Sequence, residues 1–288
     1  MRRMKSDSYL YIEINGLKIA YQRQGRGDPI LLVHGTTTYS FIWDTLVPGL
    51  STSFDVIAID LLGGGKSDKP RQADYSIFAQ AEIIHNFISA LGLKPVHLVS
   101  HGAGGGIGQV MAIRYPYQLM DLVFINPFGY DKWPVQPVDM MRVPFIWDIA
   151  VAMFDLGFLR MVIEQGVYHK DRITEEVMRL FSEPVKTRDG KYGFLQLAKS
   201  LSSRDLTDLR EELCRLNMPV LIIRGSADPY LSPQISRKLH EEIKGSTLIQ
   251  IETGGHFIQL DEPDKLVSLI KDFISGSVDS HPVKGGGQ

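Results

Sequence analysis

Apolar and polar positions along the chain follow two alternating periods. Residues 9–25 alternate around Asn15-Gly16, a dipeptide typical of a two-residue hairpin turn. Continuous runs of Val, Ile and Leu predict strands covered on both faces, at residues 30–35, 55–60, 96–100, 121–125, 220–225 and 247–252. Between them apolar residues recur at helical spacing, at residues 77–92, 106–116, 232–245 and 261–276. This alternation predicts an α/β fold with a mostly parallel central sheet flanked by helices.

One long stretch breaks the alternation. Between about residues 127 and 216 no run is a good candidate for a parallel strand, and the sequence is helical and rich in Met, Phe and Trp. Such an insertion between two strands predicts a helical cap over the carboxyl ends of the sheet. We therefore expect a core of residues 1–127 and 216–276, a helical cap of residues 128–215 and a disordered tail of residues 277–288. The cap aromatics either pack the cap on the core or line an apolar pocket, and packing is favoured for most of them.

The composition is that of a soluble globular protein. The 288 residues are 44% hydrophobic and 22% charged, with a net charge of −2. This balance argues against nucleic-acid binding, and no apolar run approaches the ~20 residues that span a membrane. The start of the chain lacks the apolar segment of a signal peptide. Because Cys214 is the only cysteine, no disulfide can form within the chain, and we expect a cytoplasmic protein. We further expect a monomer or homodimer whose partner is a small-molecule substrate.

Two glycine-rich stretches invite a nucleotide-binding interpretation, and neither has the required register. In LLGGGKSD a phosphate loop would need a glycine five positions before Gly65, where the chain has Asp60. In GAGGGIG, residues 102–108, the spacing of a dinucleotide motif fails at Ile107. Nucleotide binding is therefore weakly supported, and we expect no metal or other cofactor.

The second of these stretches fits a nucleophile elbow better. In LVSHGAGGGIG, residues 98–108, a strand turns abruptly into a helix, with small residues two places before and two places after Gly102. Such a turn exposes one residue at its apex in a strained conformation with positive φ. With this motif the chain resembles the α/β-hydrolase superfamily over residues 10–275. Four further stretches resemble loops of that family. Residues 31–44 resemble its oxyanion loop and residues 55–70 its Asp-x-x-Gly-x-Gly-x-Ser loop. Residues 220–233 resemble the loop that bears the catalytic acid, and residues 252–266 the loop that bears the catalytic His.

The resemblance implies roles for particular residues. Asp228 in VLIIRGSADPYLSP stands at the acid position, and His256 in ETGGHFIQLDEPDKL stands at the base position. On its own Asp228 also fits a turn aspartate, and only the pairing with His256 favours the acid role. The two should lie within hydrogen-bond reach, with the free imidazole nitrogen facing the space above Gly102. The backbone N–H groups of Thr36 and Ala103 stand where the family has its oxyanion hole.

Gly102 departs from the family pattern. The family has Ser at this nucleophile position, or less often Cys or Asp, and Asp usually accompanies a neighbouring Trp and a His-Gly-x-Pro loop. Here the corresponding residues are Ala103 and Thr37, so Ser is the residue that Gly102 is expected to replace. Without it no acyl-enzyme can form at this site. We do not expect a neighbouring hydroxyl to act instead; the candidates are Ser100, Thr36, Thr37 and Thr38.

Three interpretations of function remain open. In the first, which we favour, the chain is a carboxylic-ester hydrolase scaffold inactivated at Gly102, with a small, largely apolar substrate. In the second, His256 and Asp228 act as a general base without a covalent step, as in lyases, cyclases or cofactor-free oxygenases of this fold. In the third, the chain is a non-catalytic small-molecule binder, and the retained His–Asp pair argues against it.

Overall fold

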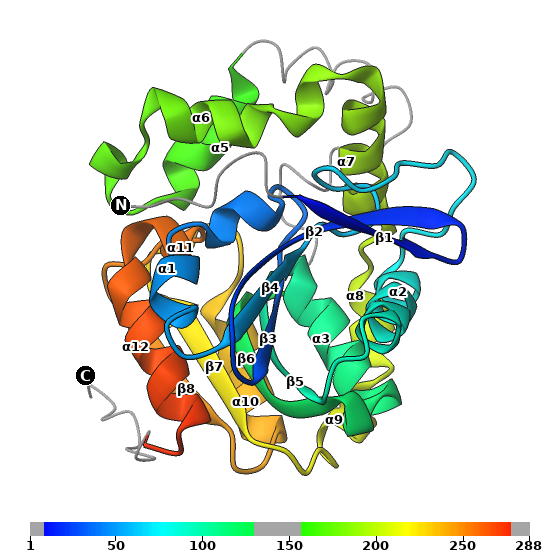
Figure 1. Cartoon of the computed structure of the whole chain (residues 1–288). Helices are drawn as coiled ribbons and strands as arrows, with labels where there is room; N and C mark the ends of the chain where they lie inside the picture. Colours follow the sequence, from blue (N-terminus) through cyan, green and yellow to red (C-terminus); the bar gives the residue numbers. More distant parts are fainter. Residues whose placement is uncertain (1–8, 130–156, 278–288) are drawn as a thin grey trace.

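The computed structural model describes residues 9–129 and 157–277 and has the α/β architecture that the hydrophobic pattern predicts. One eight-stranded sheet runs through the molecule in the order β1-β2-β4-β3-β5-β6-β7-β8 (Figure 1). Its strands are β1 (Leu10–Ile14), β2 (Leu17–Gly25), β3 (Pro29–Val33), β4 (Asp55–Ile59), β5 (Val96–Gly102), β6 (Leu119–Pro127), β7 (Val220–Gly225) and β8 (Thr247–Ile251). The β1–β2 and β2–β4 pairs are antiparallel and the other neighbouring pairs are parallel. The prediction of a mostly parallel sheet is confirmed.

Helices cover both faces of this sheet. On one face pack α2 (Ile77–Ala90), α3 (Ala103–Arg114) and α10 (Pro233–Glu242), and on the other α1 (Val47–Leu50) and α12 (Pro263–Ile274) (Figure 1). Three short helical segments complete the layers: η1 (Ser40–Trp43), η2 (Pro116–Gln118) and α11 (Ile258–Asp261).

Strand β4 shows why the strand sequences are continuously apolar. Its Ile57 and Ile59 belong to the core under α2 and α3, and its Val56 and Ala58 belong to the core under α1 and α12. All four residues are fully buried. A strand covered on both faces needs apolar side chains at every position, whereas a half-exposed strand alternates. The hairpin of β1 and β2 is only partly covered: Leu10 and Tyr11 of β1 are exposed, whereas residues 19–22 of β2 are buried in succession. Its turn has φ of 53° at Asn15 and 78° at Gly16, as a type I′ turn requires.

The described elements between β6 and β7 are all helical, and within residues 157–219 there is no strand. They are α5 (Phe158–Gly166), η4 (Lys170–Arg172), α6 (Glu175–Ser182), η5 (Pro184–Lys186), α7 (Arg188–Ser200), α8 (Ser203–Thr207) and α9 (Arg210–Leu213). Figure 1 shows α5, α6 and α7 as a layer above the rest of the molecule. This layer meets the loops at the carboxyl ends of strands, because Phe257, which follows β8, donates its backbone N–H to the Gly166 carbonyl at 2.9 Å.

The last two helices of this insertion leave that layer. Leu206 of α8 and Leu213 of α9 are fully buried in the same core as α3. The predicted cap boundaries, residues 128–215, also include residues 130–156, which lie outside the described residues, as does most of the predicted tail. The cap boundaries and the tail therefore stay predictions.

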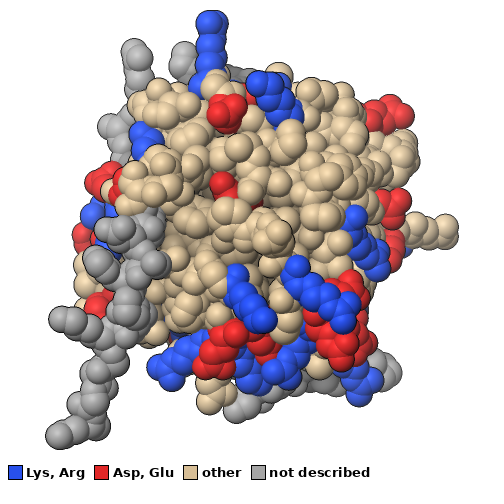
Figure 2. All heavy atoms as spheres, turned by 90° about the horizontal axis from the view of Figure 1, so that it is seen from below, with Lys and Arg blue, Asp and Glu red and all other residues tan. Residues whose placement is uncertain are grey.

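The surface carries charges of both signs. In the view from below in Figure 2, Lys and Arg side chains are interspersed with Asp and Glu most densely along one side of the face, and further charged side chains of both signs are scattered over the rest of it. In residues 9–129 and 157–277, no helix combines the length and the apolar character needed to cross a bilayer.

Candidate active site

The turn from β5 into α3 has the geometry of a nucleophile elbow. Gly102 is the N-cap residue of α3 and has φ of 55° and ψ of −120°. This conformation strains a residue with a side chain, whereas glycine adopts it freely. Two residues later α3 lies against the end of β3, where a Cβ on Gly104 would approach the Val33 carbonyl oxygen to 2.6 Å. Close packing therefore requires glycine at position 104. The helix α3 begins at Ala103, three residues earlier than the predicted start at Gly106, although its glycines have low helix propensity.

Packing does not require glycine at position 102. A Cβ on Gly102 would lie 3.6 Å from Gly35 Cα and 3.8 Å from both Cε1 and Nε2 of His256. These are ordinary van der Waals distances, so the apex has room for a side chain. Such a side chain would contact the His256 ring, and only the positive φ favours glycine.

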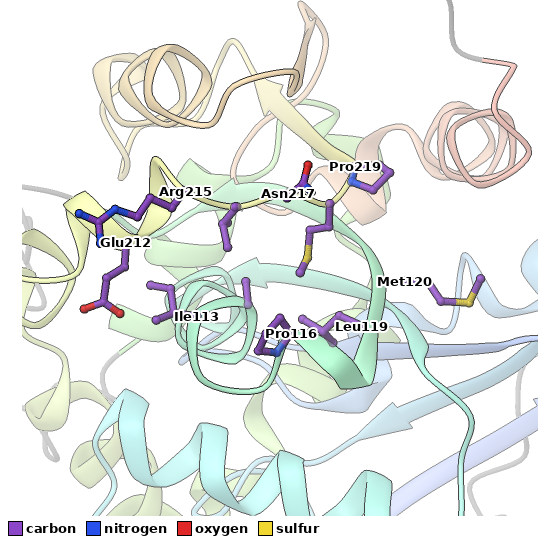
Figure 3. Close-up of a pocket in the computed structure, with 11 residues that line it drawn as sticks. Ile113, Pro116, Leu119, Met120, Glu212, Arg215, Asn217 and Pro219 are labelled. Atoms are coloured by element: carbon purple, nitrogen blue, oxygen red, sulfur yellow. The ribbon is translucent and has the colours of Figure 1, made fainter.

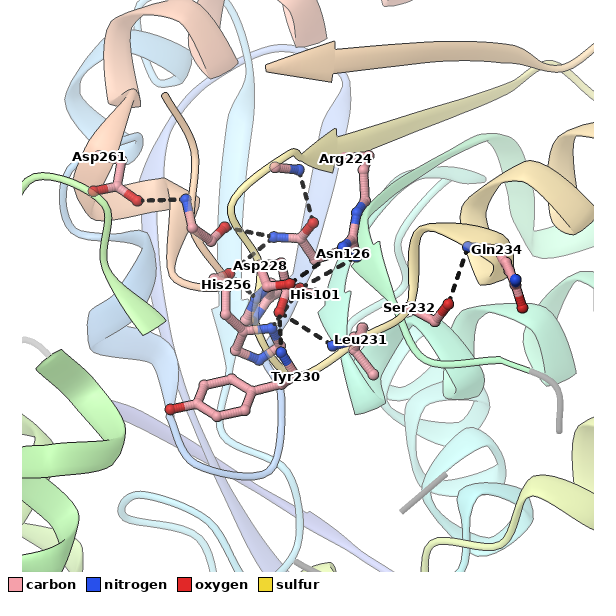
Figure 4. Close-up of polar contacts among 12 residues, drawn as sticks. His101, Asn126, Arg224, Asp228, Tyr230, Leu231, Ser232, Gln234, His256 and Asp261 are labelled. Atoms are coloured by element: carbon pink, nitrogen blue, oxygen red, sulfur yellow. Dashed lines mark hydrogen bonds and ion pairs between the residues drawn. The ribbon is translucent and has the colours of Figure 1, made fainter. Parts of the chain in front are cut away.

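His256 and Asp228 form a hydrogen-bonded pair beside this elbow (Figure 4). His256 Nδ1 lies 2.9 Å from Asp228 Oδ2. Because a carboxylate only accepts, Nδ1 carries the proton and Nε2 is left as the basic nitrogen. The Asp228 side chain is fully buried, whereas that of His256 is 12% exposed. The structure thus brings together the two residues at the acid and base positions, with the basic nitrogen next to Gly102.

Several groups hold Asp228 as a carboxylate. Its Oδ1 accepts the backbone N–H of Tyr230 at 2.8 Å and that of Leu231 at 3.2 Å. Arg224 Nη1 lies 3.5 Å from Oδ2. Burial alone would raise the pKa of Asp228, but the charge and hydrogen bond of His256 and the charge of Arg224 outweigh it and lower the pKa below its ordinary value. An ionised Asp228 can stabilise an imidazolium on His256.

The residues at the oxyanion positions flank Gly102. Ala103 is the first residue of α3, so its N–H has no acceptor within the helix, and a Cβ on Gly35 would lie 3.6 Å from the Ala103 nitrogen. Thr36 follows Gly35 on the loop after β3. His34 holds this loop in place, because its Nδ1 donates to the Gly35 carbonyl at 2.7 Å and its Nε2 accepts the Leu61 N–H at 2.9 Å. With both ring nitrogens engaged, His34 is not available for proton transfer.

Ser100 lies beneath the turn rather than at its apex. Its side chain is fully buried, and its Oγ is 3.4 Å from the Val123 carbonyl oxygen and 3.1 Å from the position of a Cβ on Gly108 in α3. This position fits the small-residue slot of the elbow and not a nucleophile. The threonines at residues 36–38 instead line a small cavity beside the oxyanion loop.

That cavity lies between the loops of the core and the helical layer above them. From the core it is lined by residues 36–38 and 63–65, and from the helical layer by Leu159, Phe181, Pro184, Val185, Phe194 and Leu197. Phe181 and Phe194 also pack in the core that contains α1 and α12. These aromatics therefore both pack the insertion on the core and line an apolar cavity, the two roles between which the sequence left a choice.

A wider groove lies elsewhere on the molecule (Figure 3). It is bordered by the end of α3, the start of β6 and the approach to β7, with Met120, Leu216 and Met218 among its lining residues. Gly102, by contrast, lies at the carboxyl end of β5. The titratable lining residues of the groove are Glu212 and Arg215, which form no catalytic pair. Within the part of the chain that the structure describes, no group of His, Cys, Asp and Glu is arranged to hold a metal ion.

Sequence reasoning passed over three residues that contact the His–Asp pair. Arg224 is buried against Asp228, with a side chain that is 3% exposed. Asn126 Nδ2 and His101 Nε2 lie 3.0 Å and 2.9 Å from the His256 carbonyl oxygen. Each is a polar residue near the end of an apolar strand, in VLIIRG, LVFIN and LVSHG. That was an available signal, because a polar group on a strand covered on both faces needs a buried partner.

His101 should make the folded chain sensitive to acid. Burial, with a further contribution from His256, lowers the pKa of His101 to about 3. In the unfolded chain a histidine has a pKa of about 6.5, so between these values the unfolded state binds a proton that the folded state does not, and the free energy of unfolding should fall as pH decreases. Urea unfolding at several pH values between about 7 and 4 measures this slope. His101→Gln should flatten it, and an equal slope in the variant would contradict the assignment.

Comparison with known proteins identifies the family of the chain. A sequence profile of the family described as alpha/beta hydrolase fold matches residues 28–263. Monoacylglycerol lipase abhd6-B of Xenopus laevis is 26% identical over 303 residues, which cover 97% of this chain and 86% of that protein. Haloalkane dehalogenase 2 of Mycobacterium bovis is 27% identical over 262 residues, which cover 88% of this chain and 90% of that protein.

Solved structures share the fold. The crystal structure of an alpha/beta hydrolase fold protein from Burkholderia ambifaria matches with a TM-score of 0.82 at 23% sequence identity, over 94% of this chain and all of that chain. The profile match spans the elbow, the loop after β3 and the loops that carry Asp228 and His256. The chain therefore belongs to the alpha/beta hydrolase fold family.

Proposed function

We propose that the chain is a carboxylic-ester hydrolase scaffold that lacks the nucleophile of its covalent step and takes a small, largely apolar substrate. The observation that carries the proposal is the position of a Cβ on Gly102, 3.8 Å from His256 Nε2. A serine Oγ, one bond further along, could reach hydrogen-bond distance of that nitrogen. The elbow, the base and the acid all suit a hydroxyl that Gly102 does not supply.

The chemistry of such a site follows from its parts. His256 would take the proton of an attacking hydroxyl, and Asp228 would stabilise the imidazolium. The N–H groups of Ala103 and Thr36 would donate to the oxyanion that develops on the ester carbonyl. With glycine at position 102 the first covalent bond cannot form, so His256 can activate only a water or a group of the substrate. Ester hydrolysis by the unaltered chain would then be slow and would pass through no acyl-enzyme.

The cavity beside the oxyanion loop supports the substrate class. Its lining from the helical layer is apolar, with Leu159, Phe181 and Val185 among its residues, which suits an apolar acyl or alkyl group. Its volume is only about 10 Å³, so these side chains would have to move apart to admit such a group. The polar lining comes from the threonines at residues 36–38, next to the position of the ester carbonyl. Among the relatives, the name monoacylglycerol lipase supports an ester substrate, while the name haloalkane dehalogenase describes a different hydrolysis.

A second candidate is an enzyme of the lyase, cyclase or cofactor-free oxygenase type that uses the His–Asp pair as a general base. The 2.9 Å contact between His256 Nδ1 and Asp228 Oδ2 favours it, because the pair is intact although Gly102 offers it no hydroxyl. Such an enzyme would remove a proton from its substrate and stabilise the resulting anion on the Ala103 and Thr36 N–H groups.

A fluorophosphonate, which phosphonylates serine nucleophiles, should leave the unaltered chain unlabelled in intact-protein mass spectrometry. Any turnover of p-nitrophenyl acetate should lack a burst and should fall further in His256→Ala, because only base-assisted attack by water remains. Gly102→Ser is the positive control and should be labelled once, at position 102. Stoichiometric labelling of the unaltered chain at Ser100 or at a threonine of residues 36–38 would reveal a substitute nucleophile and overturn the proposal.

A further inference from the structure

Two side chains outside the His–Asp pair bind the backbone carbonyl of His256. His101 Nε2 lies 2.9 Å from this oxygen and Asn126 Nδ2 lies 3.0 Å from it. His101 and Asn126 are both 0% exposed and come from the neighbouring strands β5 and β6 (Figure 4). A carbonyl oxygen has two lone pairs, and here side-chain donors occupy both.

Asn126 joins the segments that carry the base and the acid. Its Nδ2 also donates to the Gly255 carbonyl at 2.9 Å, and its Oδ1 accepts the N–H of Gly225 at 2.9 Å. Gly255 precedes His256, and Gly225 ends the strand that leads to Asp228. Asn126 has φ of 42°, an uncommon conformation for a residue other than glycine. Strain of this kind persists where the surrounding contacts impose it, and it concentrates at functional sites.

His101 can make its contact in only one form. Because a carbonyl only accepts, Nε2 carries the proton and Nδ1 is a bare acceptor. Nδ1 is buried without a hydrogen-bond partner among the described residues, and it would lie 3.3 Å from a Cβ on Gly35. Burial lowers the pKa of His101 to about 3, so the ring stays a neutral donor at neutral pH. His101 therefore fills the space between the oxyanion loop and His256, whose ring centroid is 4.8 Å away.

We propose that His101 and Asn126 are positioning residues that hold the His256 imidazole next to Gly102 through the His256 backbone carbonyl. The inference rests on the proposed function in one respect, that His256 is the base. The bond to Asp228 anchors one end of the ring, at Nδ1, and the two donors anchor the backbone from which the ring extends. Anchoring both ends sets the direction of Nε2, and a displacement of about 1 Å at a reacting group can reduce the rate about 100-fold.

The kinetic test uses Gly102→Ser as its background. Asn126→Asp keeps the shape of the side chain and tolerates positive φ, but it replaces the Nδ2 donor by an oxygen. His101→Phe removes a donor, and His101→Gln retains one. In Asn126→Asp and His101→Phe we expect kcat to fall about 10- to 100-fold with KM within about twofold, and His101→Gln should recover part of the loss.

Gln118→Glu is the matched control for Asn126→Asp. The buried Gln118 carboxamide also donates to a backbone carbonyl, that of His85 at 3.2 Å, but from η2, before the other end of β6. A change of the same kind there should lower the melting temperature and leave kcat unchanged. If Asn126→Asp does not fold, Asn126→Gly replaces it, because glycine adopts the positive φ freely and also lacks the donor.

A second measurement does not depend on ester turnover. In ¹⁵N NMR spectra of the unaltered chain, His101 should be protonated at Nε2, and the His256 Nδ1–H should give a low-field proton resonance that Asn126→Gly shifts or broadens. If Gly102→Ser is inactive and these signals are found, the proposed function fails while the positioning role stands. A His101 ring protonated at Nδ1, or an active Gly102→Ser enzyme whose kcat Asn126→Asp and His101→Phe leave unchanged, would overturn the inference.

Discussion

Gly102→Ser should turn the chain into an ester hydrolase that forms an acyl-enzyme. Loss of the nucleophile from a serine triad costs about a millionfold in kcat, so even a partial return would stand far above the activity of the unaltered chain. The backbone at the apex already has φ of 55° and ψ of −120°, and a Cβ there would lie 3.8 Å from His256 Nε2. The new hydroxyl therefore needs no rearrangement of the elbow to meet its base.

The same substitution should lower the free energy of unfolding by about 1 kcal/mol. A side chain held at positive φ costs about 1–3 kcal/mol, and a hydrogen bond from the hydroxyl to His256 returns about 1 kcal/mol. Gly102→Ala is the matched control, because it places a Cβ at the same φ without a hydroxyl. We expect Gly102→Ala to be less stable than Gly102→Ser and to remain inactive, which separates backbone strain from chemistry.

The assay is hydrolysis of p-nitrophenyl esters from acetyl to octanoyl, followed from the burst into the steady state. Among the parent, Gly102→Ser, Gly102→Ala and the double variant Gly102→Ser with His256→Ala, only Gly102→Ser should show a burst and turnover. If a well-folded Gly102→Ser variant is inert toward all of these esters, the ester-hydrolase proposal is wrong. The general-base candidate would then be the function that the site supports.

The sheet could be predicted from the sequence because its signal is local. Strands covered on both faces, such as β4 and β7, are apolar at nearly every position, with Asp55 and Arg224 at or near their ends as the exceptions, and the helices between them carry their own period. The position of the elbow could be predicted for a similar reason, because the strand, the small residues and the helix are consecutive. The helix α3 begins at Ala103, three residues before the apolar periodicity that predicts it at residues 106–116, because glycines 104–106 carry no apolar side chains from which a period could be recognised.

The residues that support the His–Asp pair could not be predicted in their roles. His101 and Asn126 meet His256 only after the sheet brings together residues separated by 155 and 130 positions. Each appears in the sequence as a single polar residue in an apolar strand, which reveals that it has a buried partner but not which one. The contact of Arg224 with Asp228 could not be predicted either. The two residues are four positions apart, a spacing that brings side chains together in a helix but not at the end of a strand and in the loop that follows it. Contacts of this kind are set by tertiary packing and not by local pattern.

Asp228→Asn should lower the free energy of unfolding by about 3–5 kcal/mol, because it strands a buried charge. Arg224 Nη1 lies 3.5 Å from Asp228 Oδ2, and the Arg224 side chain is only 3% exposed. Burial lowers the pKa of Arg224 despite the attraction of Asp228, so its guanidinium is already poorly solvated. Asparagine keeps the size of the side chain and can still accept the Tyr230 N–H, but its amide nitrogen then faces the His256 Nδ1–H, so the loss also includes this hydrogen bond.

This loss of stability should shrink in acid. The pKa of Asp228 is lowered in the folded chain, whereas an aspartate in the unfolded chain has a pKa of about 3.9. A depressed folded pKa contributes stability that is present above the unfolded pKa and is lost as pH falls through the folded pKa. The difference between the parent and Asp228→Asn should therefore decrease below about pH 4, as Asp228 becomes protonated.

The Arg23–Asp55 pair is the matched control for this charge effect. Its Nη2–Oδ2 distance is shorter, 2.6 Å, but the Arg23 side chain is 38% exposed. Water can therefore solvate the cation that Asp55→Asn leaves behind, and this variant should lose about 1 kcal/mol or less of its free energy of unfolding. In the buried pair, Arg224→Met should restore most of the stability that Asp228→Asn removes, because it takes away the stranded charge. Urea unfolding of the parent, the single variants and this double variant measures the coupling. If Asp228→Asn costs no more than Asp55→Asn, or if Arg224→Met adds to its loss, then Asp228 does not compensate the charge of Arg224.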